Sequence, residues 1–157
     1  EVKEGIESFK GVKRRFEYHI KTEKLVYIDD YAHHPTEIDA LINSVRELYP
    51  EHRVSGIFQP HLYSRTRDFA DGFAESLSKL DTLILMDIYP AREKPIPGVN
   101  SGMLLEKAES AEKLHLTTTD ILTHFRENTV KNHVILTIGA GDIDQLVNPL
   151  KMVLLNG

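Results

Sequence analysis

Residues 25–37 have the sequence LVYIDDYAHHPTE, an apolar run that ends in two acidic residues and then turns into a proline. The run is typical of a buried strand. Beyond the turn, apolar residues recur at helical spacing, as Ile38, Leu41, Ile42, Val45 and Leu48. Pro35 suits the first turn of that helix, because an amide proton missing there breaks no hydrogen bond. Strand, polar turn and helix in this order are half of a βαβ unit, and such sheets bind ligands beside the carboxyl ends of their strands.

The same alternation of strand and helix continues along the rest of the chain. We predict strands at residues 12–20, 25–30, 53–58, 82–88, 113–117 and 134–138, and helices at 35–49, 69–80, 102–108, 120–127 and 143–150. In the first strand, the alternation places Phe16, Tyr18 and Ile20 on one face. The polar turn after that strand indicates an antiparallel pairing with the next one. The prediction is an α/β fold: a doubly wound, mostly parallel six-stranded sheet, Rossmann-like, with one antiparallel edge strand.

Three residues are expected to shape the ends of the later helices. Ser101 is expected to cap the helix at 102–108, and Asp142 to cap the last helix. Pro149 falls inside the pattern of the last helix and should kink or divide it.

Composition limits the classes of protein to which this chain can belong. Its 157 residues fit one domain, and the missing initial methionine suggests a piece of a longer chain. A net charge of −5 argues against a nucleic-acid-binding module. No apolar run approaches the ~20 residues of a membrane span. The absence of cysteine excludes disulfides and thiolate sites and is compatible with the cytoplasm.

Polar segments follow four of the predicted strands, at residues 29–34, 59–67, 89–94 and 139–142. Because the carboxyl ends of parallel strands share one edge of the sheet, we expect the four segments to converge. The clearest signal is PHLYSRTR at 60–67, just before a helix, since arginine forks bind carboxylate or phosphate oxygens. The alternative is a solvated helix start at which Arg65 and Arg67 pair with Asp68 and Asp71.

The histidines allow several interpretations. His33 and His34 lie near two acids, but adjacent imidazoles rarely bind one ion and the H-x-x-x-H spacing is absent, so we predict no metal site. His61 is either a base or a simple loop histidine. The remaining five lack polar neighbours in the sequence and are predicted to be surface residues: His19, His52, His115, His124 and His133.

The sequence GAGD at 139–142 follows a strand but is not a dinucleotide fingerprint, because the third glycine is missing and the motif closes the chain. A tight turn is the preferred interpretation. The loop at 89–100 is either a lid, a contact surface for another domain or a long excursion. No P-loop and no nucleophile elbow occur, so the site resembles half of a catalytic centre.

Four motifs together resemble one known family. They are GVKRRFE at 11–17, DDYAHHPTE at 29–37, FQPHLYSRTRD at 58–68 and YPARE at 89–93. In this order they are similar to the C-terminal domain of the Mur ligases, and the resemblance covers essentially the whole chain. It implies that residues 1–157 form a single amino-acid-binding domain of a cytoplasmic enzyme of peptidoglycan synthesis. The N-terminal UDP-binding and central ATPase domains would lie outside this chain.

Within that family, the motifs resemble the members that use L-alanine. The resemblance implies an ATP-dependent ligase that joins L-alanine to UDP-N-acetylmuramate through an acyl phosphate. ATP and Mg²⁺ would be held mainly by the central domain, and the isolated C-terminal domain would be inactive. The implied partners are the two other domains and these substrates, with no nucleic acid and no membrane.

The resemblance also implies roles for residues before and within the 29–37 motif. Arg15 resembles the arginine that reaches the ATP phosphates, and Asp30 the acid that binds the ATP ribose. Tyr31, His33 and His34 lie where the family contacts substrate. His33 would orient or deprotonate the amine of alanine, since an imidazole titrates near the working pH.

The 58–68 motif supplies the remaining implied contacts. His61 and Arg65 match residues that hold the substrate carboxylate and the acyl group, and Arg67 is a weaker candidate. One departure is Leu62, where many relatives carry arginine, so one anion contact is in doubt. Asp142 lies near the substrate in the same layout.

Two other functions are alternatives to the ligase domain. One is a stand-alone α/β module that binds an anion or small molecule. The other is an independent hydrolase that uses His33, His34 and Asp30 with a metal ion. The missing initial methionine and the missing P-loop favour the ligase domain.

Overall fold

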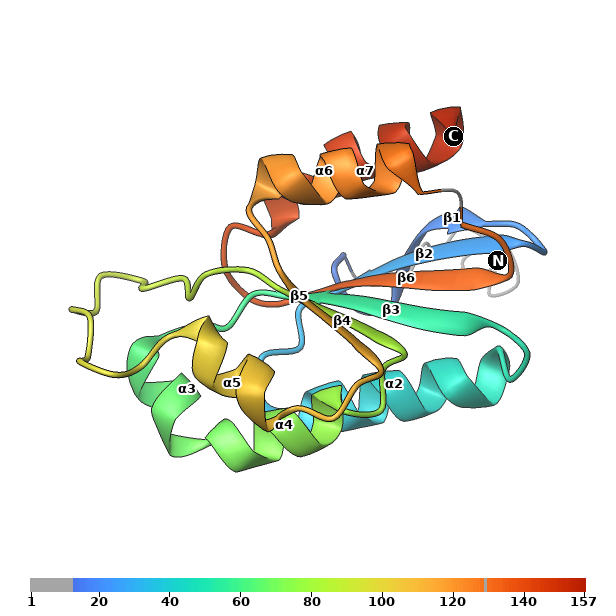
Figure 1. Ribbon diagram of the computed structural model, residues 1–157. Helices are drawn as coiled ribbons and strands as arrows, with labels where there is room; N and C mark the ends of the chain where they lie inside the picture. The colour runs from blue at the N-terminus through green and yellow to red at the C-terminus, as the bar shows by residue number, and fades with distance from the viewer. Residues whose placement is uncertain (1–12, 129) are drawn as a thin grey trace, which may run out of the picture.

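The computed structural model describes residues 13–128 and 130–157, and its centre is a six-stranded sheet with the order β1-β2-β6-β3-β4-β5 (Figure 1). The strands are β1 (Glu17–Lys21), β2 (Leu25–Asp30), β3 (Arg53–Phe58), β4 (Thr82–Leu85), β5 (Glu112–His115) and β6 (His133–Ile138). β1 pairs antiparallel with β2, and all the pairs from β2 to β5 are parallel. The predicted fold class, with its antiparallel edge strand, is confirmed.

Helices cover both faces of the sheet (Figure 1). On one face lie α2 (Pro35–Leu48), α3 (Tyr63–Asp68), α4 (Ala70–Leu77) and α5 (Ser101–Lys107). On the other lie α6 (Thr118–Glu127) and α7 (Asp144–Asn156). The chain therefore leaves β6 toward one layer and leaves its neighbours β2 and β3 toward the other. Such a reversal opens a crevice at the carboxyl ends of the strands, where open α/β sheets bind ligands.

The two-sided burial explains why the parallel strands are continuously apolar. In β6, Val134, Leu136 and Ile138 pack in the cluster with α2 and α4, whereas Ile135 packs in the cluster with α6 and α7. Successive strand residues point to opposite faces, so both layers take apolar residues from every central strand. Each fully buried aliphatic side chain is worth about 1.5–3 kcal/mol relative to exposure.

The first strand differs from the prediction. The part of the predicted strand before residue 13 lies outside the described residues, and β1 begins at Glu17. Its register shifts by one residue, because Tyr18 pairs with Ile28 while Ile20 pairs with Tyr27. This β-bulge reverses the facing of the strand, so Ile20 packs on the α7 side and Tyr18 on the α2 side. Phe16 and Tyr18 therefore lie on the same side, and the prediction that Ile20 lies there with them was wrong.

Several helices also differ from the prediction in where they begin or in how they are capped. The predicted loop at 59–67 contains α3, whose Thr66 hydroxyl donates to the carbonyl of Leu62. Asn100, not Ser101, caps α5, because the Ser101 hydroxyl donates to the carbonyl of Met86. Pro149 does not divide α7, which continues through it from Asp144 to Asn156 although the proline cannot donate a hydrogen bond to the carbonyl of Gln145.

Four of the five histidines predicted to lack polar partners have them. His19 Nε2 lies 3.0 Å from Oε1 of Glu17. His52 Nε2 contacts the carbonyl of Glu23 at 2.9 Å, and His115 Nε2 contacts Asp87 Oδ1 at 2.7 Å. His133 was also wrongly placed on the surface: it is only 9% exposed, and its Nε2 lies 2.6 Å from the hydroxyl of Ser55. Burial, with a smaller effect of nearby Arg53, lowers the pKa of His133 to about 4.

His133 should make the chain less stable as the pH falls from 7 to 4. Its folded pKa of about 4 lies below the ordinary value of 6.5, so the unfolded chain takes up the proton first. Stability is therefore complete above pH ~6.5 and declines toward pH ~4, by about 3 kcal/mol at most. Urea unfolding of His133→Gln should show a pH dependence smaller by that amount. His115→Gln, which removes an exposed histidine, should keep the wild-type pH dependence, and an unchanged dependence in His133→Gln would refute the assignment.

Candidate functional site

The polar segments that follow β2, β3, β4 and β6 meet at one edge of the sheet, which we call the rim (residues 29–34, 59–67, 89–94 and 139–142). Backbone hydrogen bonds join them in sequence. The amide of Gly139 donates to the carbonyl of Asp30 at 3.1 Å, and the amide of Gln59 donates to the carbonyl of Ile138 at 3.1 Å. The amide of Leu62 donates to the carbonyl of Tyr89 at 2.9 Å. The predicted convergence of the four segments is confirmed.

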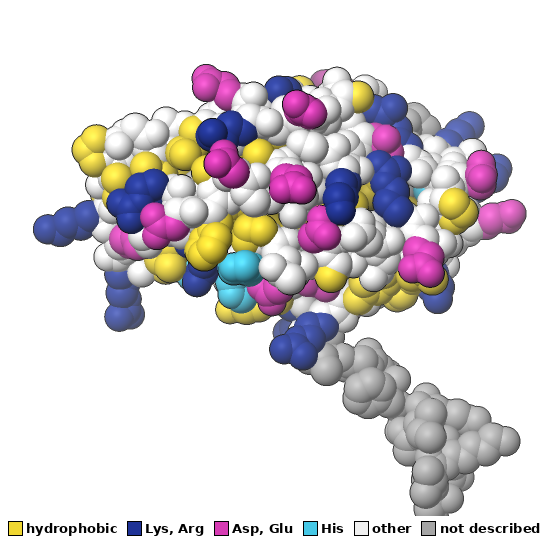
Figure 2. Space-filling view, turned by 90° about the horizontal axis from the view of Figure 1, so that it is seen from below, with side chains coloured by type: hydrophobic (Ala, Val, Ile, Leu, Met, Phe, Trp, Pro, Cys, Tyr) yellow, Lys and Arg dark blue, Asp and Glu magenta, His cyan; other side chains and the backbone are white. Residues whose placement is uncertain are grey.

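A row of aromatic rings lies along the rim. The rings of Tyr31 and His33 are 5.3 Å apart, those of His33 and His61 6.4 Å, and those of His61 and Tyr89 5.6 Å with near-parallel planes. Histidine side chains gather beside acidic ones on the face formed by α2 to α5 (Figure 2). Two of the predicted catalytic and binding residues, His33 and His61, are thus brought together although they follow different strands.

The hydrogen bonds of His33 fix its tautomer. Its Nδ1 lies 3.0 Å from the carbonyl oxygen of Tyr31 and 3.7 Å from Oε1 of Glu37. Both partners accept hydrogen bonds, so Nδ1 carries the proton. In the neutral ring, Nε2 therefore carries the free lone pair, which is the form that a general base requires.

His61 has the opposite tautomer. Arg65 lies one helical turn further on, and its Nη1 is 3.1 Å from His61 Nδ1. A guanidinium only donates, so Nδ1 accepts and the hydrogen of the neutral ring lies on Nε2. Burial, and then the positive charge of Arg65, lowers the pKa of His61. His61 is therefore a neutral donor at pH 7, next to a half-buried guanidinium.

The backbone before α3 is strained where it presents these two residues. Leu62, the residue before α3, has φ of 72°, in the left-handed region that costs a non-glycine residue about 1–3 kcal/mol. The Tyr89 carbonyl holds the amide of Leu62, and the Leu62 carbonyl accepts from Thr66. Such strain gathers at functional sites.

The two arginines of α3 have different surroundings. Arg67 is exposed and pairs with Asp68 at 2.9 Å, as the helix-start alternative predicted. Arg65 does not pair with Asp71, which binds Lys107 instead. Residues two apart in a helix point in nearly opposite directions, which is why Arg65 alone faces His61.

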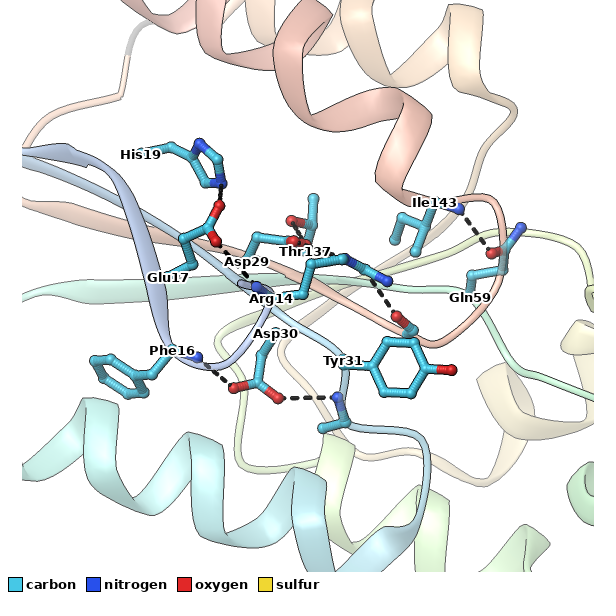
Figure 3. Close-up of polar contacts among 12 residues, drawn as sticks. Arg14, Phe16, Glu17, His19, Asp29, Asp30, Tyr31, Gln59, Thr137 and Ile143 are labelled. Carbon is cyan, nitrogen blue, oxygen red and sulfur yellow. Dashed lines mark hydrogen bonds and ion pairs between the residues drawn. The ribbon is translucent and has the colours of Figure 1, made fainter. Parts of the chain in front are cut away.

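Asp30 accepts hydrogen bonds from two backbone amides, one of them in the turn just before β1. Its Oδ2 accepts from the amide of Phe16 at 2.7 Å, and its Oδ1 accepts from the amide of Ala32 at 2.9 Å (Figure 3). Burial raises the pKa of Asp30, although both amides oppose that change. Arg15, directly before Phe16, is exposed. The two residues with implied roles toward ATP are therefore near neighbours at the carboxyl end of β2.

His34 and Tyr31 flank His33 in different ways. His34 is the N-cap of α2, because its Nδ1 accepts from the amide of Thr36 at 3.2 Å, and Pro35 occupies the first turn as predicted. The His34 ring contacts exposed Phe69 edge-on, with centroids 4.8 Å apart. Tyr31 is 47% exposed. Both side chains remain accessible at the rim.

The loop after β6 needs its glycines for close packing. A Cβ on Gly139, whose φ is 148°, would lie 2.9 Å from the carbonyl oxygen of Gln59, and one on Gly141 would lie 2.7 Å from Cγ of Tyr89. The tight turn is thus supported. Asp142 does not cap α7: its Oδ1 accepts from Gln59 Nε2 at 2.6 Å, while Gln59 Oε1 accepts from the amide of Ile143.

Arg14 was not among the predicted site residues. Its Nε donates to Asp29 Oδ2 at 2.8 Å, and Asp29 is itself buried and accepts from the hydroxyl of Thr137. An acid inside a strand that is apolar on both faces requires a cation, and that was the available signal. That signal does not distinguish Arg14 from the adjacent Arg15, which was the arginine given a role.

In the described ranges 13–128 and 130–157, no three His, Asp or Glu side chains are grouped so that they could hold a metal ion. The helices of the same ranges include none that is both long and apolar enough to cross a membrane.

Comparisons with known proteins agree with the motifs. Residues 14–141 match the family described as "Mur ligase, glutamate ligase domain". The chain is 54% identical over 153 residues to the UDP-N-acetylmuramate–L-alanine ligase of Flavobacterium johnsoniae, covering 98% of this chain and 34% of that protein. It is 54% identical over 154 residues to the enzyme of the same name from Porphyromonas gingivalis, with the same coverage.

Solved structures give the same result. The crystal structure of the UDP-N-acetylmuramate-alanine ligase MurC from Thermotoga maritima aligns with a TM-score of 0.76 and 25% identity, over 98% of this chain and 32% of that one. The chain spans about a third of the length of the curated relatives it matches. Since the family match covers most of the chain, the chain belongs to the Mur ligase family as its glutamate ligase domain.

Proposed function

We propose that this chain is the C-terminal, amino-acid-binding domain of a cytoplasmic UDP-N-acetylmuramate–L-alanine ligase of peptidoglycan synthesis. The observation that carries the proposal is 54% identity to ligases of that name across 98% of the chain. Residues 1–157 would form one domain, with the UDP-binding and central ATPase domains on other parts of the enzyme. The rim would close against those domains and bind the incoming amino acid.

Arg65 and His61 form the anion-binding part of the rim. L-Alanine presents a carboxylate, which a guanidinium binds with two parallel hydrogen bonds. Arg65 uses Nη1 to reach His61, and its remaining donors make no hydrogen bond to another described residue, so they can bind such a ligand. The Nε2 hydrogen of neutral His61 is a second donor, suited to the acyl oxygen that gains negative charge when the amine attacks.

His33 is the group placed to take a proton from the amine. Alanine is bound as an ammonium ion and must lose a proton before it can attack an acyl phosphate. His33 has its lone pair on Nε2 because Nδ1 donates to the Tyr31 carbonyl. We assign His33 the role of general base, and Tyr31, His34 and the weaker candidate Arg67 to contacts with the substrates.

The opposite end of the rim faces the nucleotide in this proposal. ATP, together with Mg²⁺, supplies the phosphoryl group that activates the muramoyl carboxylate. Arg15 is exposed and makes no hydrogen bond to another described residue, so its guanidinium can reach phosphate oxygens. Asp30 uses one lone pair of each oxygen for an amide, and a carboxylate has about four such positions, so it can still accept from ribose hydroxyls. We propose that the Mg²⁺ ligands belong to the central domain.

Reconstitution would test the proposal. The chain would be mixed with the separately expressed UDP-binding and ATPase domains, ATP, Mg²⁺ and UDP-N-acetylmuramate, and phosphate release would be followed with and without L-alanine. We expect release that depends on L-alanine, and none from this chain alone. If the separate domains fail to dock, the same assay applies to the intact ligase. An intact enzyme that released phosphate equally without L-alanine would refute the proposal and favour a stand-alone binding module.

A further inference from the structure

We infer that Arg14 is a positioning residue. It holds the strained turn at residues 14–16, just before β1, and so directs Arg15 toward the nucleotide. The inference rests on the proposed role of Arg15. Arg14 joins the ends of two strands: its Nε and Nη2 bind the two oxygens of Asp29 at 2.8 and 3.3 Å, and Nη2 also donates to the carbonyl of Gly139 at 2.8 Å (Figure 3).

The backbone of Arg14 is held as firmly as its side chain. Its amide donates to Oε2 of Glu17 at 3.0 Å, and its carbonyl accepts from the amide of Tyr31 at 2.7 Å. The guanidinium carbon also lies 5.4 Å from the centre of the Tyr31 ring. One residue therefore links β1, the end of β2 and the loop after β6. The side chain is only 13% exposed, and that of Asp29 2%, so water competes little for the ion pair.

These contacts offset an unfavourable backbone. Arg14 has φ of 59° and Phe16 has φ of 46°, and each left-handed non-glycine residue costs about 1–3 kcal/mol. The two adjacent acids hold the two strained residues, since Asp29 binds the side chain of Arg14 and Asp30 accepts from the amide of Phe16. Without the Arg14 side chain, the turn loses the anchor on its first strained residue.

Arg15 lies between the two strained residues. Because both of its neighbours are anchored to the end of β2, the direction of the Arg15 backbone is fixed relative to the rim. The side chain itself is exposed and makes no hydrogen bond to another described residue. A displacement of about 1 Å at a positioned group can lower a rate about 10²-fold. Arg14 thus acts on the nucleotide end of the site without touching the nucleotide.

A double-mutant cycle in the intact ligase would test the inference. Arg14→Ala and Arg15→Ala should each lower kcat/KM for ATP by about 10²-fold, and the double variant should be no worse than Arg15→Ala alone. Hydrogen exchange of the peptide covering residues 13–20 should become faster in Arg14→Ala. If Arg14→Ala is too unstable to purify, Arg14→Lys keeps the charge but cannot bind Asp29 and Gly139 together, so the same results are expected of it.

The control is Arg46→Ala. Arg46 likewise bridges a carboxylate and a carbonyl, those of Asp81 and Lys79, but far from the rim. The Arg46→Ala variant should have a kcat/KM for ATP within about twofold of the wild-type value, even if the protein becomes less stable. Effects of Arg14 and Arg15 that multiply in the double variant would overturn the inference. An unchanged kcat/KM in Arg15→Ala would instead count against the proposed role of Arg15, and the exchange rate would then decide whether Arg14 closes the turn.

Discussion

Replacing His33 with glutamine in the intact ligase should lower kcat about 10²- to 10⁴-fold, the usual contribution of a general base. Glutamine retains a donor that can reach the carbonyl of Tyr31, which His33 Nδ1 contacts at 3.0 Å, but it supplies no basic nitrogen. The loss should therefore fall on the chemical step. KM for L-alanine should stay within about threefold, since the amide fills similar space. Steady-state phosphate release at saturating ATP would measure both constants.

A matched control is available for this prediction. His52→Gln changes another histidine whose ring nitrogen contacts a backbone carbonyl, that of Glu23, at the opposite end of the sheet. It should leave kcat unchanged. Raising the pH should partly rescue a variant that lacks the base, because more of the amine is then already deprotonated. Normal kcat in His33→Gln, or a loss equally large in His52→Gln, would remove His33 from the mechanism.

Replacing Arg65 with alanine should have its main effect on binding of L-alanine. A charged, bidentate contact that is partly desolvated is worth about 2–5 kcal/mol, so KM for L-alanine should rise about 30-fold or more. Arg65→Lys should recover only part of the loss, since an ammonium lacks the planar fork. The change also removes the partner of His61 Nδ1, so kcat should fall as well. Initial rates against L-alanine concentration would separate the two effects.

Two other arginines provide control variants for this prediction. Arg67→Ala should raise KM much less than Arg65→Ala, because Arg67 is exposed and pairs with Asp68. Arg126→Ala removes an exposed arginine of α6, on the other face of the sheet, and should change nothing. The assignment of the carboxylate to Arg65 would be wrong if the larger increase in KM appeared in Arg67→Ala.

Much of the fold could be predicted because its strongest signals are local. The apolar run before Asp29, the helical spacing after Pro35 and the polar segments at strand ends each depend on a few neighbouring residues. Parallel topology then brings those segments to one edge without further information. Three of the four motifs that resemble the Mur ligases overlap these same segments, so fold and family could be predicted together.

The features that were missed depend on contacts distant in sequence. The bulge after Tyr18 is set by pairing with β2, and no pattern in β1 alone shows it. His133 is buried because α6 lies over the start of β6, and its partner Ser55 is 78 residues away. Arg14 and Arg15 have the same side chain, and only the turn at residues 14–16 distinguishes the buried one from the exposed one. Local patterns cannot identify such pairings.

The position of β6 has a consequence for how the chain folds. This strand is the last of the described strands in sequence, yet it lies between β2 and β3, pairing Asp30 with Ile138 across more than a hundred residues. Until it is inserted, both of those neighbours have open hydrogen-bonding edges, which are templates for aggregation. Non-local parallel pairing is also slow. We therefore expect a nascent chain that ends before residue 133 to be prone to association, and the rim to be completed only after β6 has been synthesised.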